Sequence, residues 1–194
     1  LVLNGGSGSF AQIIAGMQWC ITQNVHVVNM SLGGSGYTPV WNLPVLLTTL
    51  TGALVVASIG NSGHGTSGGP GNDAFSLGVG ATHNEDAVAG FSGGQTMVSV
   101  PHVLFGNISY MKPDISGPGV QVLSCVPGGG IASLNGTSMA APHVVGAAAL
   151  VMSAAPSLMG QPLAVRSVLL GTIEDQGEAG RDQRFGFGRI DALS

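Results

Sequence analysis

Short apolar runs alternate with helical segments along most of this 194-residue chain. The runs at Val25–Met30, Ala53–Ile59 and Ser76–Thr82 are short and bounded by turn residues, which is typical of buried strands. Phe10–Asn24 carries apolar residues at helical spacing, and Leu43–Leu50 is a second helical segment. Because such alternation favours parallel βαβ units, we expect a three-layer α/β sandwich with a mostly parallel sheet and helices on both faces.

The second half of the chain predicts shorter strands and further helices. Strands are expected around residues 88–91, 97–103 and 120–125, and a last amphipathic helix over 163–170. No linker, internal repeat or low-complexity tract divides the sequence. We therefore expect one domain over residues 1–194.

Composition argues against several classes of protein. Only 7% of the residues are charged, against about a quarter in an ordinary domain, and 33 are glycine, which indicates close helix–sheet packing. A net charge of −4 with five Lys and Arg residues argues against nucleic-acid binding. No run of about 18 consecutive apolar residues predicts a membrane span. Cys20 and Cys125 form no metal or disulfide motif, so two buried thiols are expected, with a single bridge left open.

One serine stands where a glycine-containing approach meets the first turn of an apolar helix. The segment is Asn135-Gly136-Thr137-Ser138-Met139-Ala140-Ala141-Pro142-His143, followed by the small-residue helix 144–155. A hydroxyl there lies beside backbone N–H groups without helical partners, at the positive end of the helix dipole. A developing oxyanion is stabilised at such a position, so Ser138 is a candidate nucleophile. The alternative is that Thr137 or Ser138 only caps the helix.

A carboxamide follows the strand predicted at Ala53–Ile59. Asn61 is flanked by Gly60 and Gly63, so its side chain can donate a hydrogen bond into a crevice that substrate backbone approaches closely. Ligands bind outside the carboxyl ends of parallel strands, and 31–34 leaves another strand at such an end. We expect Asn61 and the N–H of Ser138 to form an oxyanion hole. A left-handed turn at Asn61 is the structural alternative.

The chain resembles the catalytic domain of subtilisin-like serine proteases, the subtilases, in order and over nearly all of its length. The segment 135–143 is similar to the nucleophile motif of the family and is the most specific match. The other similar segments are Val28–Gly34, Ala57–Gly63, Lys112–Val120 and Gly186–Ala192. The resemblance implies a subtilisin-like fold and a serine endopeptidase that hydrolyses peptide bonds through an acyl-enzyme.

Carried over to this sequence, the resemblance implies that Ser138 is the acylated nucleophile and Asn61 the side-chain donor of the oxyanion hole. It also implies flanking segments that pair with an extended substrate, and a pocket for the side chain before the scissile bond. The implied substrate-binding residues are Gly6, Ser7, Gly8, Ser31, Leu32, Gly33, Ser58, Ile59 and Gly60. No acidic residue stands in these segments, so apolar or aromatic side chains are expected in the pocket. The bond before Pro70 matches a position that is cis in the family.

Subtilases carry their triad in the order Asp, His, Ser, and the segments with Asp and His would precede Leu1. We therefore expect the C-terminal two-thirds of a catalytic domain, inactive alone, with an N-terminal fragment of the same domain as its partner. His64 could approach the crevice as a base, whereas His143 matches a structural position of the family motif. The alternative function is a non-catalytic peptide-binding pseudoprotease or an inactive fragment.

The remaining expectations concern cofactors, partners and location. The resemblance implies no required cofactor and no catalytic metal, but leaves open structural calcium in the full-length enzyme and a weak cation site near Gly71–Ser76. A peptide or protein substrate is the expected partner, with neither nucleic acid nor membrane. Leu1–Leu3 does not begin a signal peptide, so a secreted or extracytoplasmic location is a family expectation only.

Overall fold

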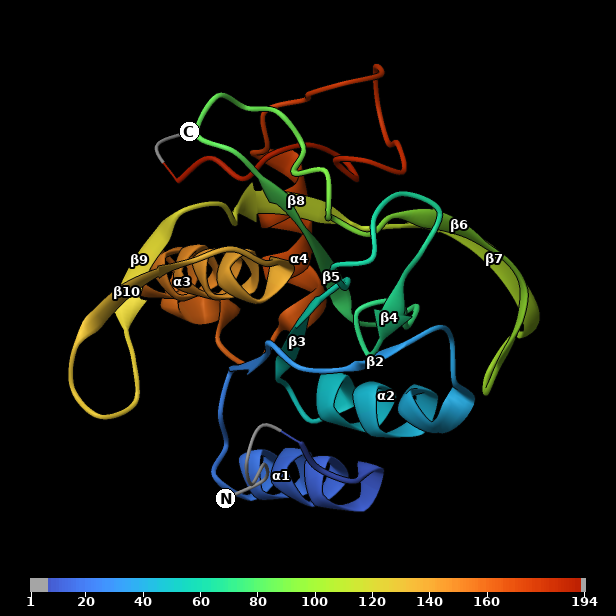
Figure 1. Cartoon of the computed structure of the whole chain (residues 1–194). Helices are drawn as coiled ribbons and strands as arrows, with labels where there is room; N and C mark the ends of the chain where they lie inside the picture. Colours follow the sequence, from blue (N-terminus) through green and yellow to red (C-terminus); the bar gives the residue numbers. More distant parts are fainter. Residues whose placement is uncertain (1–6, 193–194) are drawn as a thin grey trace.

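The computed structural model describes residues 7–192 and shows a central parallel sheet with helices on both faces (Figure 1). The sheet has the strand order β1-β3-β5-β8, and each neighbouring pair is parallel. Its strands are β1 (Val27–Met30), β3 (Leu54–Ser58), β5 (Leu77–Thr82) and β8 (Ile115–Pro118). Because parallel neighbours end on the same side, the loops after β1 and β3 meet at one edge of the sheet.

Strand β3 shows why the molecule has three layers. Its side chains point alternately to the two faces of the sheet, so Leu54 and Val56 join one buried cluster while Val55 and Ala57 join another. Two helices cover each cluster. They are α3 (Thr137–Ala154) and α4 (Pro162–Gly171) on the first face, and α1 (Phe10–Thr22) and α2 (Asn42–Leu50) on the second. The three-layer α/β sandwich expected from the sequence is confirmed.

Local signals explain where the helices begin. Ser9 and Gln12 form a capping box at the start of α1, each side chain accepting a hydrogen bond from the backbone N–H of the other residue. Pro162 is the first residue of α4, where its missing N–H would have had no helical partner. By length and composition α3 would suffice to cross a membrane, but Ala140 and Val144 on its inner face are fully buried in the core.

Three antiparallel pairs extend from the sheet. They are β2 (Gly34–Ser35) with β4 (Gly68–Gly69), β6 (Gln95–His102) with β7 (Gly106–Lys112), and β9 (Val122–Cys125) with β10 (Ile131–Leu134). The strand expected at 88–91 is wrong, since the described structure shows there only an isolated bridge between Thr82 and Val88. Strands β7 and β8 were not expected from the sequence, because their glycine, asparagine and proline residues are poor strand formers.

A buried ion cluster joins the C-terminal part of the chain to the sheet. Asp114 is fully buried and accepts hydrogen bonds from Lys112, Arg166 and Arg181 at 2.5 to 2.8 Å. Burial would raise the pKa of Asp114, but the three cations hold that pKa below its usual value. Burial lowers the pKa of Lys112 to about 8, against the opposing effect of Asp114. Both partners of the closest pair are therefore charged at neutral pH.

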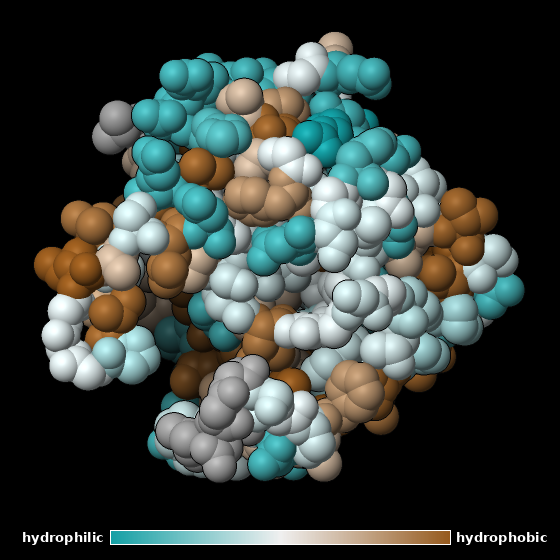
Figure 2. All heavy atoms as spheres, in the orientation of Figure 1, coloured by the Kyte–Doolittle hydropathy of each residue, from teal (hydrophilic) through white to brown (hydrophobic). Residues whose placement is uncertain are grey.

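Apolar side chains gather over the two longer hairpins at opposite sides of Figure 2. Leu123 on β9 and Val98 on β6 are among the exposed ones. Cys125, also on β9, is exposed, Cys20 on α1 is half-buried, and both are free thiols. The expectation of two buried thiols is therefore wrong for Cys125. Strand β9 belongs to a two-stranded hairpin, and three of its four residues lie outside the core.

Candidate active site

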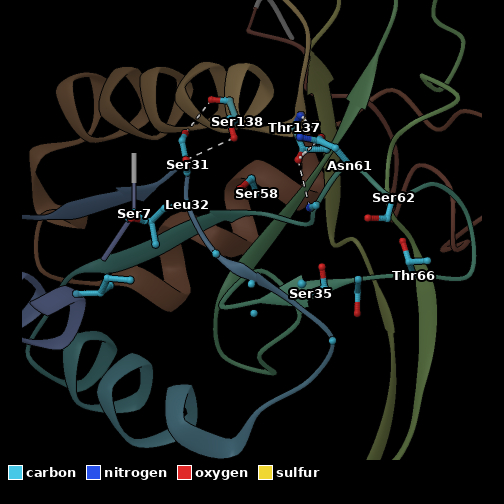
Figure 3. Close-up of a pocket in the computed structure, with 18 of the residues that line it drawn as sticks. Ser7, Ser31, Leu32, Ser35, Ser58, Asn61, Ser62, Thr66, Thr137 and Ser138 are labelled. Atoms are coloured by element: carbon cyan, nitrogen blue, oxygen red, sulfur yellow. Dashed lines mark hydrogen bonds between the residues drawn. The ribbon is translucent and has the colours of Figure 1, made fainter. Parts of the chain in front are cut away.

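A cleft of about 740 Å³ opens at the carboxyl ends of β1 and β3 (Figure 3). Its lining comes from the segment before α1, the loops after β1 and β3, strand β4 and the first turn of α3. The described residues that line it include no Asp, Glu, Lys, Arg or His. They are residues 7–8, 31–36, 58, 60–62, 66–69, 95 and 137–138, together with Ile13. Glycines and hydroxyl side chains around an uncharged groove suit the backbone of an extended peptide.

Ser138 lines this cleft from the first turn of α3, where it is half-buried. The loop after β1 fixes its position. Ser31 Oγ donates a hydrogen bond to the Ser138 carbonyl at 2.7 Å, and Ser138 Oγ donates to the Ser31 carbonyl at 3.4 Å (Figure 3). Asn29 Nδ2 donates in turn to Ser31 Oγ at 3.0 Å. Two segments 107 positions apart are thereby locked together.

Asn61 and Thr137 lie face to face across the same edge of the sheet. Asn61 Oδ1 accepts hydrogen bonds from the backbone N and from Oγ1 of Thr137, both at 2.9 Å. A backbone N–H can only donate, so the carboxamide oxygen must face it, and Nδ2 points away from Thr137. Thr137 Oγ1 also accepts a hydrogen bond from the N–H of Gly60 at 3.2 Å. Thr137 therefore fixes the orientation of the Asn61 side chain.

Two nitrogen donors border one open position beside Gly136. A Cβ atom placed on Gly136 would lie 3.4 Å from Asn61 Nδ2 and 3.7 Å from the backbone N of Ser138. Gly136 is the N-cap of α3 and provides no side-chain hydrogen bond. The N–H of Thr137 donates to Asn61 Oδ1, and those of Met139 and Ala140 donate to the Gly136 carbonyl, so in the described structure the Ser138 N–H is the one of this first turn that remains open to a ligand. Two donors at the positive end of a helix can stabilise a negatively charged oxygen.

Most of the residues predicted to bind substrate line this cleft. They are Ser7, Gly8, Ser31, Leu32, Gly33, Ser58 and Gly60. Ile59 does not line it, because its side chain is fully buried and its carbonyl accepts a hydrogen bond from Gly68. Gly6 lies outside the described residues. The peptide bond between Gly69 and Pro70 is cis, as the resemblance implies.

The structure adds residues to the cleft that the sequence did not single out. Thr66, Ser67 and Gln95 line it, and Thr137 orients Asn61. Thr66 and Ser67 stand in a glycine-rich turn, and that composition is a signal for close backbone approach. Gln95 carries no comparable signal. It reaches the cleft because Gly94 donates a hydrogen bond to the Thr66 carbonyl at 2.7 Å.

The histidines of the chain all lie within residues 7–192, and none donates to or accepts from Ser138 Oγ in the described structure. His143 shares a small hollow of about 290 Å³ with Ser138, but its Nδ1 lies 2.8 Å from the carbonyl of Met139. His64 is exposed and does not line the cleft. A general base must come within hydrogen-bonding reach of the hydroxyl, and neither ring does so here.

Lys112 reaches the turn at Gly71–Ser76, where the resemblance leaves a weak cation site open. Lys112 Nζ donates a hydrogen bond to the Ser76 carbonyl at 2.8 Å and pairs with Asp114. A buried ammonium group is therefore bonded to one carbonyl of this turn, while Asp73 Oδ2 in the same turn is buried without a hydrogen-bond partner. Within the part of the chain that the structure describes, no three His, Cys, Asp or Glu side chains come together to hold a metal.

Comparison with known proteins relates the sequence of this chain to a family of proteases. Residues 1–188 match the model of the subtilase family. The chain is 40% identical over 187 residues to alkaline elastase YaB of Bacillus sp. (strain YaB), which covers 96% of this chain and 44% of that protein. It is 42% identical over 152 residues to subtilisin Savinase of Lederbergia lenta, covering 78% of this chain and 51% of that protein.

Solved structures show the same fold. The prenylagaramide maturation protease PagA superposes with a TM-score of 0.81 at 23% identity, over all of this chain and 69% of that one. A lanthipeptide protease gives 0.82 at 20% identity, over 99% of this chain and 67% of that one. The chain spans about half or less of the length of the two curated relatives. By its sequence match over 188 residues and by its fold, the chain belongs to the subtilase family.

Proposed function

We propose that this chain carries the nucleophile and substrate cleft of a serine endopeptidase, with Ser138 as the acylated residue. The observation that supports the proposal most directly is the open position beside Gly136. Asn61 Nδ2 and the Ser138 N–H both border it, next to a cleft that suits a peptide. The position is suited to the oxygen of a scissile carbonyl once that oxygen becomes negative.

The proposed reaction has two halves. Ser138 Oγ attacks the scissile carbonyl carbon while a histidine takes the hydroxyl proton, and the carbonyl oxygen becomes an oxyanion held by Asn61 Nδ2 and the Ser138 N–H. The C–N bond then breaks, the histidine returns the proton to the leaving amine, and an acyl-enzyme remains. Water hydrolyses that ester by the same steps. We propose that the histidine and its orienting aspartate belong to a segment outside the given sequence, because no histidine of this chain bonds Ser138 Oγ.

A peptide-binding protein without catalytic activity is the second candidate. The hydrogen bond from Ser138 Oγ to the Ser31 carbonyl favours this second candidate, because the hydroxyl proton then faces a carbonyl oxygen and not a general base. The same cleft would then hold an extended peptide by backbone pairing alone. The proposal also includes a segment outside the given sequence, peptide or protein substrates, and a location outside the cytoplasm. The relatives suggest all three.

Active-site labelling of the full-length protein separates the two candidates. A fluorophosphonate probe reacts with a serine hydroxyl only when a base activates it. We expect wild type to be labelled rapidly and Ser138→Ala not at all, with the label on the peptide that contains Ser138. Equal labelling of wild type and Ser138→Ala would exclude Ser138 as the nucleophile. Peptide binding by an unlabelled wild type would support the second candidate.

A further inference from the structure

We infer that Gln95 determines specificity in this cleft and that the side-chain pocket prefers a neutral residue that donates hydrogen bonds, above all glutamine. The inference rests on the proposed protease function and adds the class of residue before the scissile bond. Nothing in the sequence pattern or in the resemblance pointed to Gln95.

Backbone hydrogen bonds place Gln95 behind the segment that leads to Asn61. Gly93 donates to the Gly60 carbonyl at 2.9 Å, and Gly68 donates to the Ile59 carbonyl at 2.7 Å. The segments 58–60, 66–69 and 93–95 are therefore packed together. Gln95 follows Gly93 by two residues, about 7 Å of extended chain, and it lines the cleft. This is the region that would hold the side chain before the scissile bond.

The carboxamide of Gln95 has a fixed orientation. Its Nε2 donates to Ser67 Oγ at 2.7 Å and lies 3.2 Å from Met97 Sδ. A thioether sulfur only accepts hydrogen bonds, so the amide nitrogen must be the atom that faces it. Ser67 Oγ also accepts from Asn72 Nδ2 at 2.9 Å, and its own hydrogen faces Met97 Sδ. Within the described residues no group donates to Gln95 Oε1, and this oxygen is not among the buried unpaired atoms, so it is an acceptor open to a ligand in the cleft that Gln95 lines.

The residues around Gln95 determine which substrate side chains this acceptor can bind. Thr66 lines the cleft beside Gln95 and Gly60 adds no side chain there, while Gly68 is packed against Gly34, whose carbonyl oxygen would lie 2.7 Å from an added Cβ. The surface over β2 and β4 is correspondingly pale in Figure 2, neither strongly apolar nor charged. An aliphatic side chain of the substrate would bury Oε1 without donating a hydrogen bond to it. A buried acceptor without a partner costs binding free energy, so the site disfavours aliphatic side chains.

Charged side chains are disfavoured for separate reasons. A carboxylate has no proton to donate to Gln95 Oε1. A lysine or arginine has donors, but its charge would enter a cleft whose described lining contains no acidic residue. A primary amide satisfies Oε1 and carries no charge. This preference differs from the apolar or aromatic one that the resemblance implies, because that expectation took account of 58–60 but not of Thr66, Ser67 and Gln95.

The test uses the full-length protein and peptide substrates that differ only in the residue before the scissile bond. Glutamine, methionine and glutamate have almost the same shape, and lysine adds a positive charge. We expect kcat/KM for glutamine to exceed that for each of the other three by about ten- to a hundredfold. Gln95→Met should abolish the preference for glutamine over methionine. Gln161→Met, which changes an exposed glutamine outside the cleft, should preserve it.

Two outcomes overturn the inference, and they are distinguishable from failure of the proposed function. If the fluorophosphonate probe labels Ser138 but wild type cleaves the methionine or lysine peptide faster, the protease proposal stands and the role of Gln95 is wrong. If wild type prefers glutamine and well-folded Gln95→Met shows the same preference, another residue sets it. If the probe labels nothing and no peptide is cleaved, the proposed function fails and this inference fails with it.

Discussion

The side chain of Asn61 is held by Thr137, which donates to Asn61 Oδ1 from both its backbone N and its Oγ1 at 2.9 Å. These two bonds occupy the carboxamide oxygen and turn Nδ2 toward the open position beside Gly136. Asn61 alone could rotate about its side-chain bonds, and a rotated amide would present an acceptor to an oxyanion instead of a donor. The pair is thus a pre-oriented donor, which is the form in which electrostatic stabilisation is most effective.

Removing the Thr137 hydroxyl should weaken that orientation. Thr137→Val keeps the shape but loses both Oγ1 bonds, the one to Asn61 Oδ1 and the one from the Gly60 N–H. Because the first of these orients Asn61, we expect kcat to fall by about tenfold with little change in KM. Thr137→Ser retains the hydroxyl and should restore most of the rate. Steady-state kinetics of the full-length protein measure both. A similar loss in Thr137→Ser and Thr137→Val would show that the methyl group, not the hydroxyl, is what matters.

Removing the carboxamide should have a larger effect. Asn61→Ala is expected to reduce kcat by about a hundredfold or more while KM changes little, because the Nδ2 bond strengthens only as the oxyanion forms. Asn84→Ala, in an exposed loop away from the cleft, is the matched control and should leave both constants unchanged. Equal changes in KM and kcat would mean that Asn61 supports the cleft as a whole.

A methyl group at Gly136 should fill the position between the two donors. The added Cβ would stand 3.4 Å from Asn61 Nδ2 and 3.7 Å from Ser138 N, so the oxyanion has no room, and the backbone φ of +156° adds strain that lowers stability. We expect Gly136→Ala to lose at least a hundredfold in kcat. Gly146→Ala on the exposed side of α3 meets no atom within 4 Å and should stabilise the protein by about 0.5–1 kcal/mol without affecting kcat. Full activity in Gly136→Ala would place the oxyanion elsewhere.

Neutralising Asp114 should destabilise the fold severely. Asp114→Asn leaves the buried Lys112 and the partly buried Arg166 and Arg181 without their common counter-charge, so we expect a loss of about 3–5 kcal/mol in the free energy of unfolding. Asp86→Asn weakens a partly exposed pair with Arg189, which also pairs with Glu174, and should cost at most about 1 kcal/mol. Urea unfolding of the full-length variants provides the comparison, and equal losses would contradict the role given to burial.

Stability should rise with pH in the range where Lys112 titrates. The folded pKa of Lys112 is about 8 and the ordinary value is 10.5, so between these values the unfolded chain binds more protons than the folded one. The free energy of unfolding therefore increases with pH through this window, and below about pH 8 Lys112 contributes no slope. The increase should be absent in Lys112→Met. Parallel pH profiles for wild type and Lys112→Met would show that Lys112 is not the group that titrates.

Local patterns in the sequence were sufficient for most of the secondary structure. The apolar run 53–59 became β3, the helical spacing from Phe10 became α1, and the strand expected around 120–125 became β9. These elements depend on side-chain periods of two or about 3.6 residues, which neighbouring residues alone define. Strands β7 and β8 were not predicted because their own residues do not favour strands. Pairing with neighbouring strands stabilises them instead.

The candidate site also has a part that the sequence predicts and a part that it does not. The sequence by itself determined that Ser138 heads an apolar helix and that Asn61 ends an apolar strand, since both facts follow from short runs of neighbouring residues. Only the tertiary structure decided that Thr137 orients Asn61 from 76 positions away and that Gln95 faces the cleft. It also brought the Lys112 ammonium group to the Ser76 carbonyl, 36 positions away. These contacts depend on strand order and on the packing of loops from distant parts of the chain, and local residue patterns carry no information about either.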